Sequence, residues 1–146
     1  KLMCATAKRL GGDKKRVLFS RPYAGAENFE TSCATGRERF EWYDALRVRT
    51  PEFQNNGPTY GWTWEAIWAS KAVLAPGAVE HIDIPVWLFT AEDDNSVMPD
   101  AQKAFAARLR DGKRTLVPGS KHEIYRSPDA VVFPWWRGIL EFFREG

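Results

Sequence analysis

The hydrophobic positions of this chain change their spacing about halfway along. Up to residue 76 they recur at helical intervals or follow no period, whereas from residue 84 short apolar runs alternate with helical stretches. Strands and helices that alternate in this way are typical of a parallel sheet covered by helices. We therefore predict two regions, 1–76 and 77–146, with the boundary between Leu74 and Ile84.

The first region is predicted to begin with a short helix and a long loop. Residues 1–10 read as a helix that Gly11 and Gly12 end, because glycine readily adopts the backbone conformation found just after a helix. Residues 13–34 show no sustained period and contain proline, glycine and asparagine. We expect an extended loop there.

Two longer helices are predicted next. Thr35 and Glu38 match a capping box, in which each side chain accepts a hydrogen bond from the other residue's backbone N–H, so a helix should start there and run up to Pro51. Residues 55–59, Asn-Asn-Gly-Pro-Thr, indicate a turn, and the following helix should end before Pro76. The apolar faces would be formed by Phe40, Tyr43 and Leu46 in the first helix and by Trp64, Ile67, Trp68 and Leu74 in the second.

The second region has the pattern strand, helix, strand, helix. Residues 84–89 are a continuous apolar run, which is typical of a strand buried on both faces of a parallel sheet. A helix opened by a proline is expected over 99–110, and a second strand over 115–117. The last helix, 129–144, contains Pro134, which either starts it or kinks it near its beginning. Its core face would consist of Trp136, Ile139, Leu140 and Phe143, and Trp135 should also lie in the core.

The fold class predicted from this order is α/β with an incomplete sheet. Two parallel strands expose both faces and both edges, and stable sheets usually contain several more strands. The chain also begins without a methionine. We therefore expect it to be the C-terminal part of a larger protein, in which another segment completes the sheet.

Composition narrows the classes of function. The chain is 44% hydrophobic and 27% charged, as in ordinary globular proteins. The net charge is only +2 and the basic residues are scattered among acids, which argues against nucleic-acid binding. Cys4 and Cys33 have neither CxxC nor zinc-ligand spacing, so we expect reduced thiols in a cytoplasmic protein. No apolar run approaches the roughly 18 residues that a membrane-spanning helix needs.

An acidic residue and a histidine follow the two predicted strands. Asp94 lies in the loop after the first strand and His122 in the loop after the second. The carboxyl ends of parallel strands meet at one edge of a sheet, where catalytic groups gather. A carboxylate that accepts the Nδ1–H of an imidazole fixes its tautomer and stabilises the imidazolium, as the general base of a nucleophile requires. Asp93 is the alternative acid, and His81 is predicted to be structural.

The order of acid and then histidine is that of α/β-hydrolases. The segments PVWLFTAEDDNSVMPDAQKAF and LVPGSKHEIYRSPD resemble the acid and histidine segments of bacterial lysophospholipases related to monoacylglycerol lipases, and GPTYGWTWEA resembles the lid that precedes them. The resemblance covers nearly the whole chain. It implies that Asp94 is the catalytic acid, that His122 is the catalytic base and that the neighbouring Glu123 is structural.

The same resemblance implies a lid over 1–76 and a monoacyl lipid as substrate. The aromatic residues that would line the acyl-chain site are Trp62, Trp64 and Trp68, with simple helix packing as the alternative role. No cofactor is implied. No metal site is predicted either, because Glu92, Asp93, Asp94 and Asp100 lack the glycine and the final glutamate of a calcium loop.

The family's nucleophile is absent from these residues. It lies in a G-x-S-x-G turn, and the sequence contains neither this motif nor an HG-type oxyanion loop. We therefore expect the chain to contribute the acid and the histidine of a serine ester hydrolase acting on lysophospholipids or monoacylglycerols, with peripheral contact to a membrane, and to be inactive without its N-terminal half. The rival hypothesis is a non-enzymatic module that binds lipid or dimerises to complete its sheet.

Overall fold

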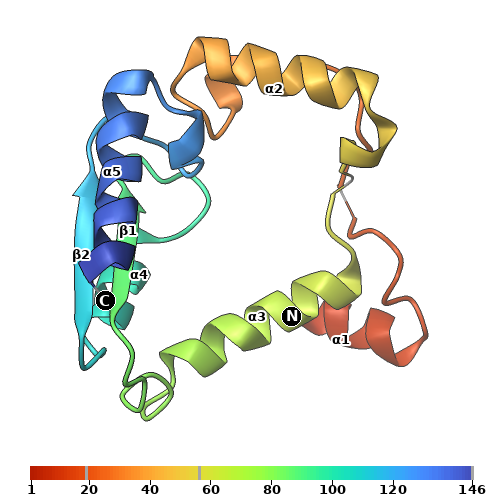
Figure 1. Ribbon diagram of the computed structural model, residues 1–146. Helices are drawn as coiled ribbons and strands as arrows, with labels where there is room; N and C mark the ends of the chain where they lie inside the picture. The colour runs from red at the N-terminus through yellow and green to blue at the C-terminus, as the bar shows by residue number, and fades with distance from the viewer. Residues whose placement is uncertain (19, 56, 146) are drawn as a thin grey trace.

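The elements of the chain are arranged around a central opening in a computed structural model that describes residues 1–18, 20–55 and 57–145 (Figure 1). The first half contains α1 (Leu2–Arg9), η1 (Phe29–Thr31), α2 (Arg37–Arg49), η2 (Pro51–Phe53) and α3 (Tyr60–Leu74). The second half contains β1 (Val86–Ala91), α4 (Pro99–Ala106), β2 (Gly112–Val117), η3 (Ile124–Arg126) and α5 (Asp129–Glu145). The α/β class predicted from the sequence is confirmed.

The helices of the first half occupy the predicted places. The first helix ends as expected, since Gly11 has a φ of +69° and its N–H donates to the carbonyl of Lys8. The described residues of 13–34 contain η1 and an isolated bridge between Arg16 and Thr59, and otherwise form a loop. Asn56, in the predicted turn over 55–59, lies outside the described residues.

The predicted capping box is wrong. The residue that caps α2 is Gly36, one position after Thr35, and no side chain caps the helix. Gly36 donates its N–H to the carbonyl of Arg126, 2.8 Å away, and a Cβ at this position would lie 2.7 Å from the backbone carbon of Ser127. A contact with a distant part of the chain therefore sets the start of α2, and a local capping rule does not anticipate it.

The two strands pair in parallel, as predicted, but their bounds differ. Val86 pairs with Gly112 and Ala91 with Val117, so the second strand begins earlier than its apolar residues suggest. Backbone pairing defines these bounds, and the polar Lys113 and Arg114 pair as well as the residues of the predicted 115–117 run. The predicted burial of the first strand on both faces is not met, because only its last two residues are fully buried.

The predicted core face of the last helix is largely wrong. Trp135 packs edge-on against Phe89, with ring centroids 6.2 Å apart, and Phe142 packs against Trp87 at 5.8 Å. Pro134 lies inside this helix. The residues that remain substantially exposed are Phe133, Trp136, Leu140 and Phe143. The helix is therefore rotated about its axis relative to the prediction, and much of its apolar surface is uncovered.

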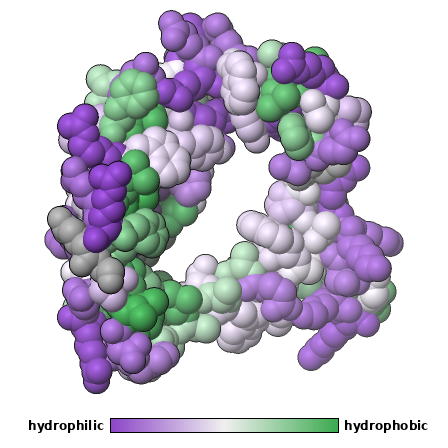
Figure 2. All heavy atoms as spheres, in the orientation of Figure 1, coloured by the Kyte–Doolittle hydropathy of each residue, from purple (hydrophilic) through white to green (hydrophobic). Residues whose placement is uncertain are grey.

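The hydrophobic core is small and lies between the sheet and α5. Ala91, Val117 and Ile124 form its buried centre, and the half-buried residues packed on them are Phe89, Val131 and Trp135. The space-filling view shows that the central opening is not closed by side chains and that hydrophobic surface gathers on the side of the sheet and α5 (Figure 2).

One arginine fixes the linker between α3 and β1. Arg108 donates from Nη1 to the carbonyl of Leu74 at 2.8 Å and from Nη2 to that of Ala75, which are orphan acceptors at the end of a helix. Its Nε and Nη2 also donate to the two carboxylate oxygens of Glu80, at 2.9 and 3.1 Å. These bonds lower the pKa of Glu80 to about 2. One guanidinium thus joins α3, the linker and the turn after α4.

Replacing this arginine should loosen the linker. In Arg108→Ala, we expect the amides of residues 75–83 to exchange severalfold faster with solvent, because local opening no longer breaks these hydrogen bonds. Hydrogen exchange followed by mass spectrometry measures this directly. Arg110→Ala removes an equal charge from an exposed position nearby and serves as the control. Equal exchange in the two variants would show that Arg108 does not hold the linker.

Candidate active site

The parallel pairing places the acid and the histidine at the same end of the sheet. Asp94 follows the last residue of β1, Ala91, by three positions, and His122 follows the last residue of β2, Val117, by five. These two terminal residues are partners in the strand register. His122 Nδ1 lies 3.1 Å from Oδ1 and 3.2 Å from Oδ2 of Asp94. The structure therefore brings together the two residues that the sequence singled out.

The Asp94 carboxylate is buried and accepts hydrogen bonds from several donors of the protein. Its side chain is 4% exposed, and its Oδ1 accepts the backbone N–H groups of Ser96 and Val97, both at 2.9 Å. Burial by itself raises the pKa of Asp94, but these N–H groups and the imidazole of His122 outweigh it and hold the pKa below its ordinary value. The residue is thus an ionised acceptor at neutral pH.

An ionised acceptor sets the tautomer of the histidine. Because the carboxylate of Asp94 has no proton to donate, Nδ1 of His122 carries the hydrogen, and Nε2 of the neutral ring is the basic nitrogen. The imidazole is 41% exposed, so Nε2 is within reach of a group from outside the chain. An accessible imidazole can take up a proton at Nε2, and a buried carboxylate behind it stabilises the cation that results.

A segment before α2 contacts both the acid loop, after β1, and the histidine loop, after β2. The carbonyl of Ser32 accepts from Asn95 Nδ2 at 3.3 Å, in the acid loop, and from Lys121 Nζ at 3.4 Å, in the histidine loop. The carbonyl of Cys33 accepts the N–H of Glu123 at 3.1 Å. We call residues 32–33 the strap. The strap ties the two loops to each other, although it lies far from both in the sequence.

The other acidic and basic candidates have different surroundings. Asp93 is exposed, and its backbone N–H donates to the carbonyl of Ser120 at 3.0 Å, so its side chain is not the one that contacts His122. Glu123 accepts hydrogen bonds from Tyr125 Oη and Arg126 Nη1, at 2.9 and 2.6 Å. His81 Nδ1 lies 3.2 Å from the carbonyl of Gly77, in the linker.

Sequence reasoning missed Gln102. This residue of α4 donates from Nε2 to Oδ2 of Asp94 at 3.2 Å. No motif or spacing rule points to it, because its position is set by how α4 packs beside the acid loop. Its only signal in the sequence is that α4 starts directly after that loop, at Pro99.

The three tryptophans expected to bind substrate all lie on α3. Trp64 and Trp68 contact each other edge-on, with ring centroids 5.7 Å apart, whereas Trp62 is 65% exposed. In Figure 1, α3 lies across the opening from the strand ends that carry Asp94 and His122. The structure therefore does not bring these rings against the acid–histidine pair. Within the described residues, no group of three or more His, Cys, Asp and Glu is arranged to hold a metal ion.

Comparisons with known proteins point to lipid hydrolases. No family model matches the chain. Its sequence is 25% identical over 125 residues, 84% of the chain, to a probable lysophospholipase L2 of Haemophilus influenzae. The chain spans 38% of the length of that relative. The resemblance to lysophospholipases inferred from the acid and histidine segments is thereby confirmed.

Solved structures show the same fold. The monoacylglycerol lipase of Paleococcus ferrophilus matches 97% of the chain with a TM-score of 0.61 at 19% identity. A soluble variant of the monoglyceride lipase of Saccharomyces cerevisiae, solved with a substrate analog, matches 99% with a TM-score of 0.69 at 15% identity. The chain covers 51% and 48% of these two proteins, so its fold corresponds to about half of such an α/β-hydrolase.

The lowered pKa of Asp94 makes a prediction about stability and pH. A carboxyl whose folded-state pKa is depressed adds stability above its unfolded pKa of about 3.8 and loses it as pH falls through the folded value. We therefore expect Asp94→Asn to destabilise the chain at pH 7, and this deficit to begin to shrink near pH 3.8 and to vanish only once the pH has fallen through the lower folded-state pKa. Urea unfolding at both pH values measures it.

The control for this prediction is Asp93→Asn, which removes the same charge at the neighbouring exposed position. It should show no deficit that depends on pH in this range. A deficit that follows Asp93 in place of Asp94 would contradict the assignment of the buried acid.

Proposed function

We propose that this chain supplies the catalytic acid and base of a serine ester hydrolase that acts on monoacyl lipids. The observation that carries the proposal is the hydrogen bond between the buried Asp94 carboxylate and the accessible imidazole of His122 at the carboxyl ends of adjacent parallel strands. Support also comes from the similarity to a probable lysophospholipase and from the fold shared with monoacylglycerol lipases.

The two residues divide the proton chemistry between them. His122 Nε2 takes the proton of a serine hydroxyl as that hydroxyl attacks the ester carbonyl, and Asp94 stabilises the imidazolium that forms. His122 then returns the proton to the departing alcohol, which leaves an acyl-enzyme. In the second half of the reaction the same nitrogen activates a water molecule, which releases the fatty acid. This chemistry needs no cofactor.

The nucleophile and the oxyanion donors come from a second segment. The outer edge of β1 has no strand partner among the described residues, and several apolar residues of α5 are exposed. A sheet edge and an apolar helix face of this kind fit a segment that adds further strands to the sheet. We assign this place to the N-terminal half of the hydrolase, which carries the G-x-S-x-G serine.

The helical part, residues 1–76, is proposed to be the lid, and residues 77–146 the part of the hydrolase core. Exposed aromatic side chains on α3, among them Trp62 at 65% and Trp68 at 48%, suit the apolar chain of a lipid.

No helix in the described part of the chain is long and apolar enough to cross a membrane. We propose a cytoplasmic enzyme that meets its substrate at a membrane surface.

The function is tested by joining the chain to a nucleophile-bearing segment and measuring ester hydrolysis. His122→Ala should lower turnover by several orders of magnitude, because no other group then takes the serine proton. His81→Ala, in the linker, is the matched control and should keep nearly full turnover. Near-normal turnover of His122→Ala would remove this residue from the proposed role.

Substrate class is tested separately with the same assembly. We expect medium- and long-chain monoacylglycerols or lysophospholipids to be hydrolysed with a higher kcat/KM than short, water-soluble esters, because only long chains gain from apolar burial. Comparable or better hydrolysis of the short esters would contradict the lipid assignment, but not the proposed roles of Asp94 and His122.

An assembly that hydrolyses no ester and forms dimers of this chain would favour the non-enzymatic rival.

A further inference from the structure

The two oxygens of Asp94 are held from different directions. Oδ1 accepts the N–H groups of Ser96 and Val97 from its own loop, whereas Oδ2 accepts the side-chain amide of Gln102 from α4. His122 Nδ1 lies almost equally far from both oxygens. The N–H groups of the loop therefore hold only Oδ1. The hydrogen bond from Gln102 to Oδ2 restricts the rotation of the carboxylate about its Cβ–Cγ bond.

The orientation of the Gln102 amide follows from the charge of its partner. An ionised carboxylate only accepts hydrogen bonds, so the NH₂ end of the amide faces Asp94 and the Oε1 end faces away. This Oε1 atom is buried and has no hydrogen-bond partner in the described structure. Burying an unpaired carbonyl is unfavourable. The orientation that lets Gln102 donate to Asp94 therefore leaves its own Oε1 without a hydrogen-bond donor among the described residues.

We propose that Gln102 is a positioning residue for the catalytic acid, which it locks in the rotation that presents the carboxylate edge to His122. The inference rests on the proposed function, since Asp94 is a catalytic acid only in a hydrolase. The hydrogen bond itself can be tested without any hydrolysis, so failure of one proposal is distinguishable from failure of the other.

A purely structural role for Gln102 makes a different prediction. If the residue only packed α4 against the loop, shortening it would change the stability of the chain but not the titration of the Asp94 carboxyl. If it donates to Oδ2, removing the donor destabilises the ionised form and raises the pKa of Asp94. The titratable side chain in contact with Asp94 is His122, and the neighbouring Asp93 and Asp100 are exposed.

The experiment is an NMR titration of the side-chain carboxyl carbon of Asp94 in the full 146-residue chain. In Gln102→Ala the pKa of Asp94 should rise by roughly one pH unit, the size expected for one hydrogen bond to a charged group. In Gln102→Glu it should rise further, because two carboxylates in contact do not both ionise readily. The second variant keeps the shape of the side chain, so it carries the test if the alanine variant fails to fold.

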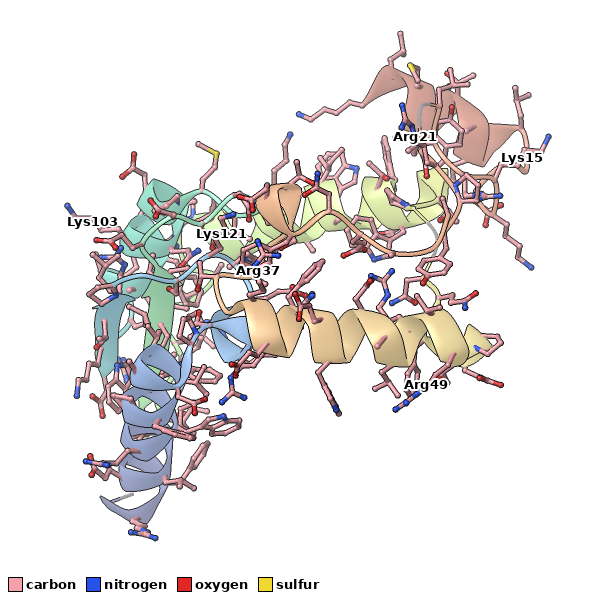
Figure 3. All side chains as sticks on the ribbon, turned by 90° about the horizontal axis from the view of Figure 1, so that it is seen from above. Lys15, Arg21, Arg37, Arg49, Lys103 and Lys121 are labelled. Atoms are coloured by element: carbon pink, nitrogen blue, oxygen red, sulfur yellow. The ribbon has the colours of Figure 1, made fainter. Side chains whose placement is uncertain are left out.

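Lys103→Ala is the matched control. It changes the net charge by the same −1 as Gln102→Glu, from the next position of α4, where the side chain is exposed and lies at the periphery of the molecule (Figure 3). Its effect on the pKa of Asp94 should stay within a few tenths of a unit. Titration of Asp94 at the wild-type pKa in either folded Gln102 variant, or a shift in Lys103→Ala as large as in Gln102→Glu, would overturn the proposal.

Discussion

The pairing of Ala91 with Val117 at the ends of two parallel strands is the constraint on which the rest of the structure depends. It brings two loops that are 28 residues apart in sequence to one edge of the sheet, where Asp94 meets His122. In an antiparallel pair, the two loops would leave from opposite ends. Because parallel strands need a crossover, α4 lies between them, and the crossover helix is the element that carries Gln102 to the acid.

Asp94 and His122 are supported from the helical part of the chain as well as from the strands. The strap carbonyl of Ser32 accepts a donor from each of the two loops that carry them, so the strap connects these loops. The strap leads directly into Gly36, where α2 rests against the backbone of Ser127. The start of α2 is therefore connected to the loops of Asp94 and His122 through a few hydrogen bonds and one close backbone contact.

The sequence predicted what depends on local or pairwise rules and missed what depends on packing. The strand–helix order follows from the length and spacing of apolar runs, which neighbouring residues determine. The meeting of Asp94 with His122 follows from that order, because parallel strands end at the same edge of a sheet. The start of α2 at Gly36 and the outward face of Trp136 depend on contacts with distant segments. Gln102 is a polar residue on a helix, and only its three-dimensional position distinguishes it from the other polar side chains of α4.

The polar contacts around Asp94 and the apolar surface of α5 are completed to different degrees within this chain. The donors that hold Asp94 are Ser96, Val97, Gln102 and His122, all of them within the chain, so the contact between Asp94 and His122 needs no group from outside it. The apolar surface, in contrast, is incomplete, because α5 exposes Trp136 and Phe143 and the core is small. The Asp94 carboxylate finds its donors within the chain, whereas burial of an exposed apolar helix face needs a second layer or further strands. The geometry of the Asp94–His122 pair is therefore set within this chain, whereas the apolar face of α5 is left uncovered by it.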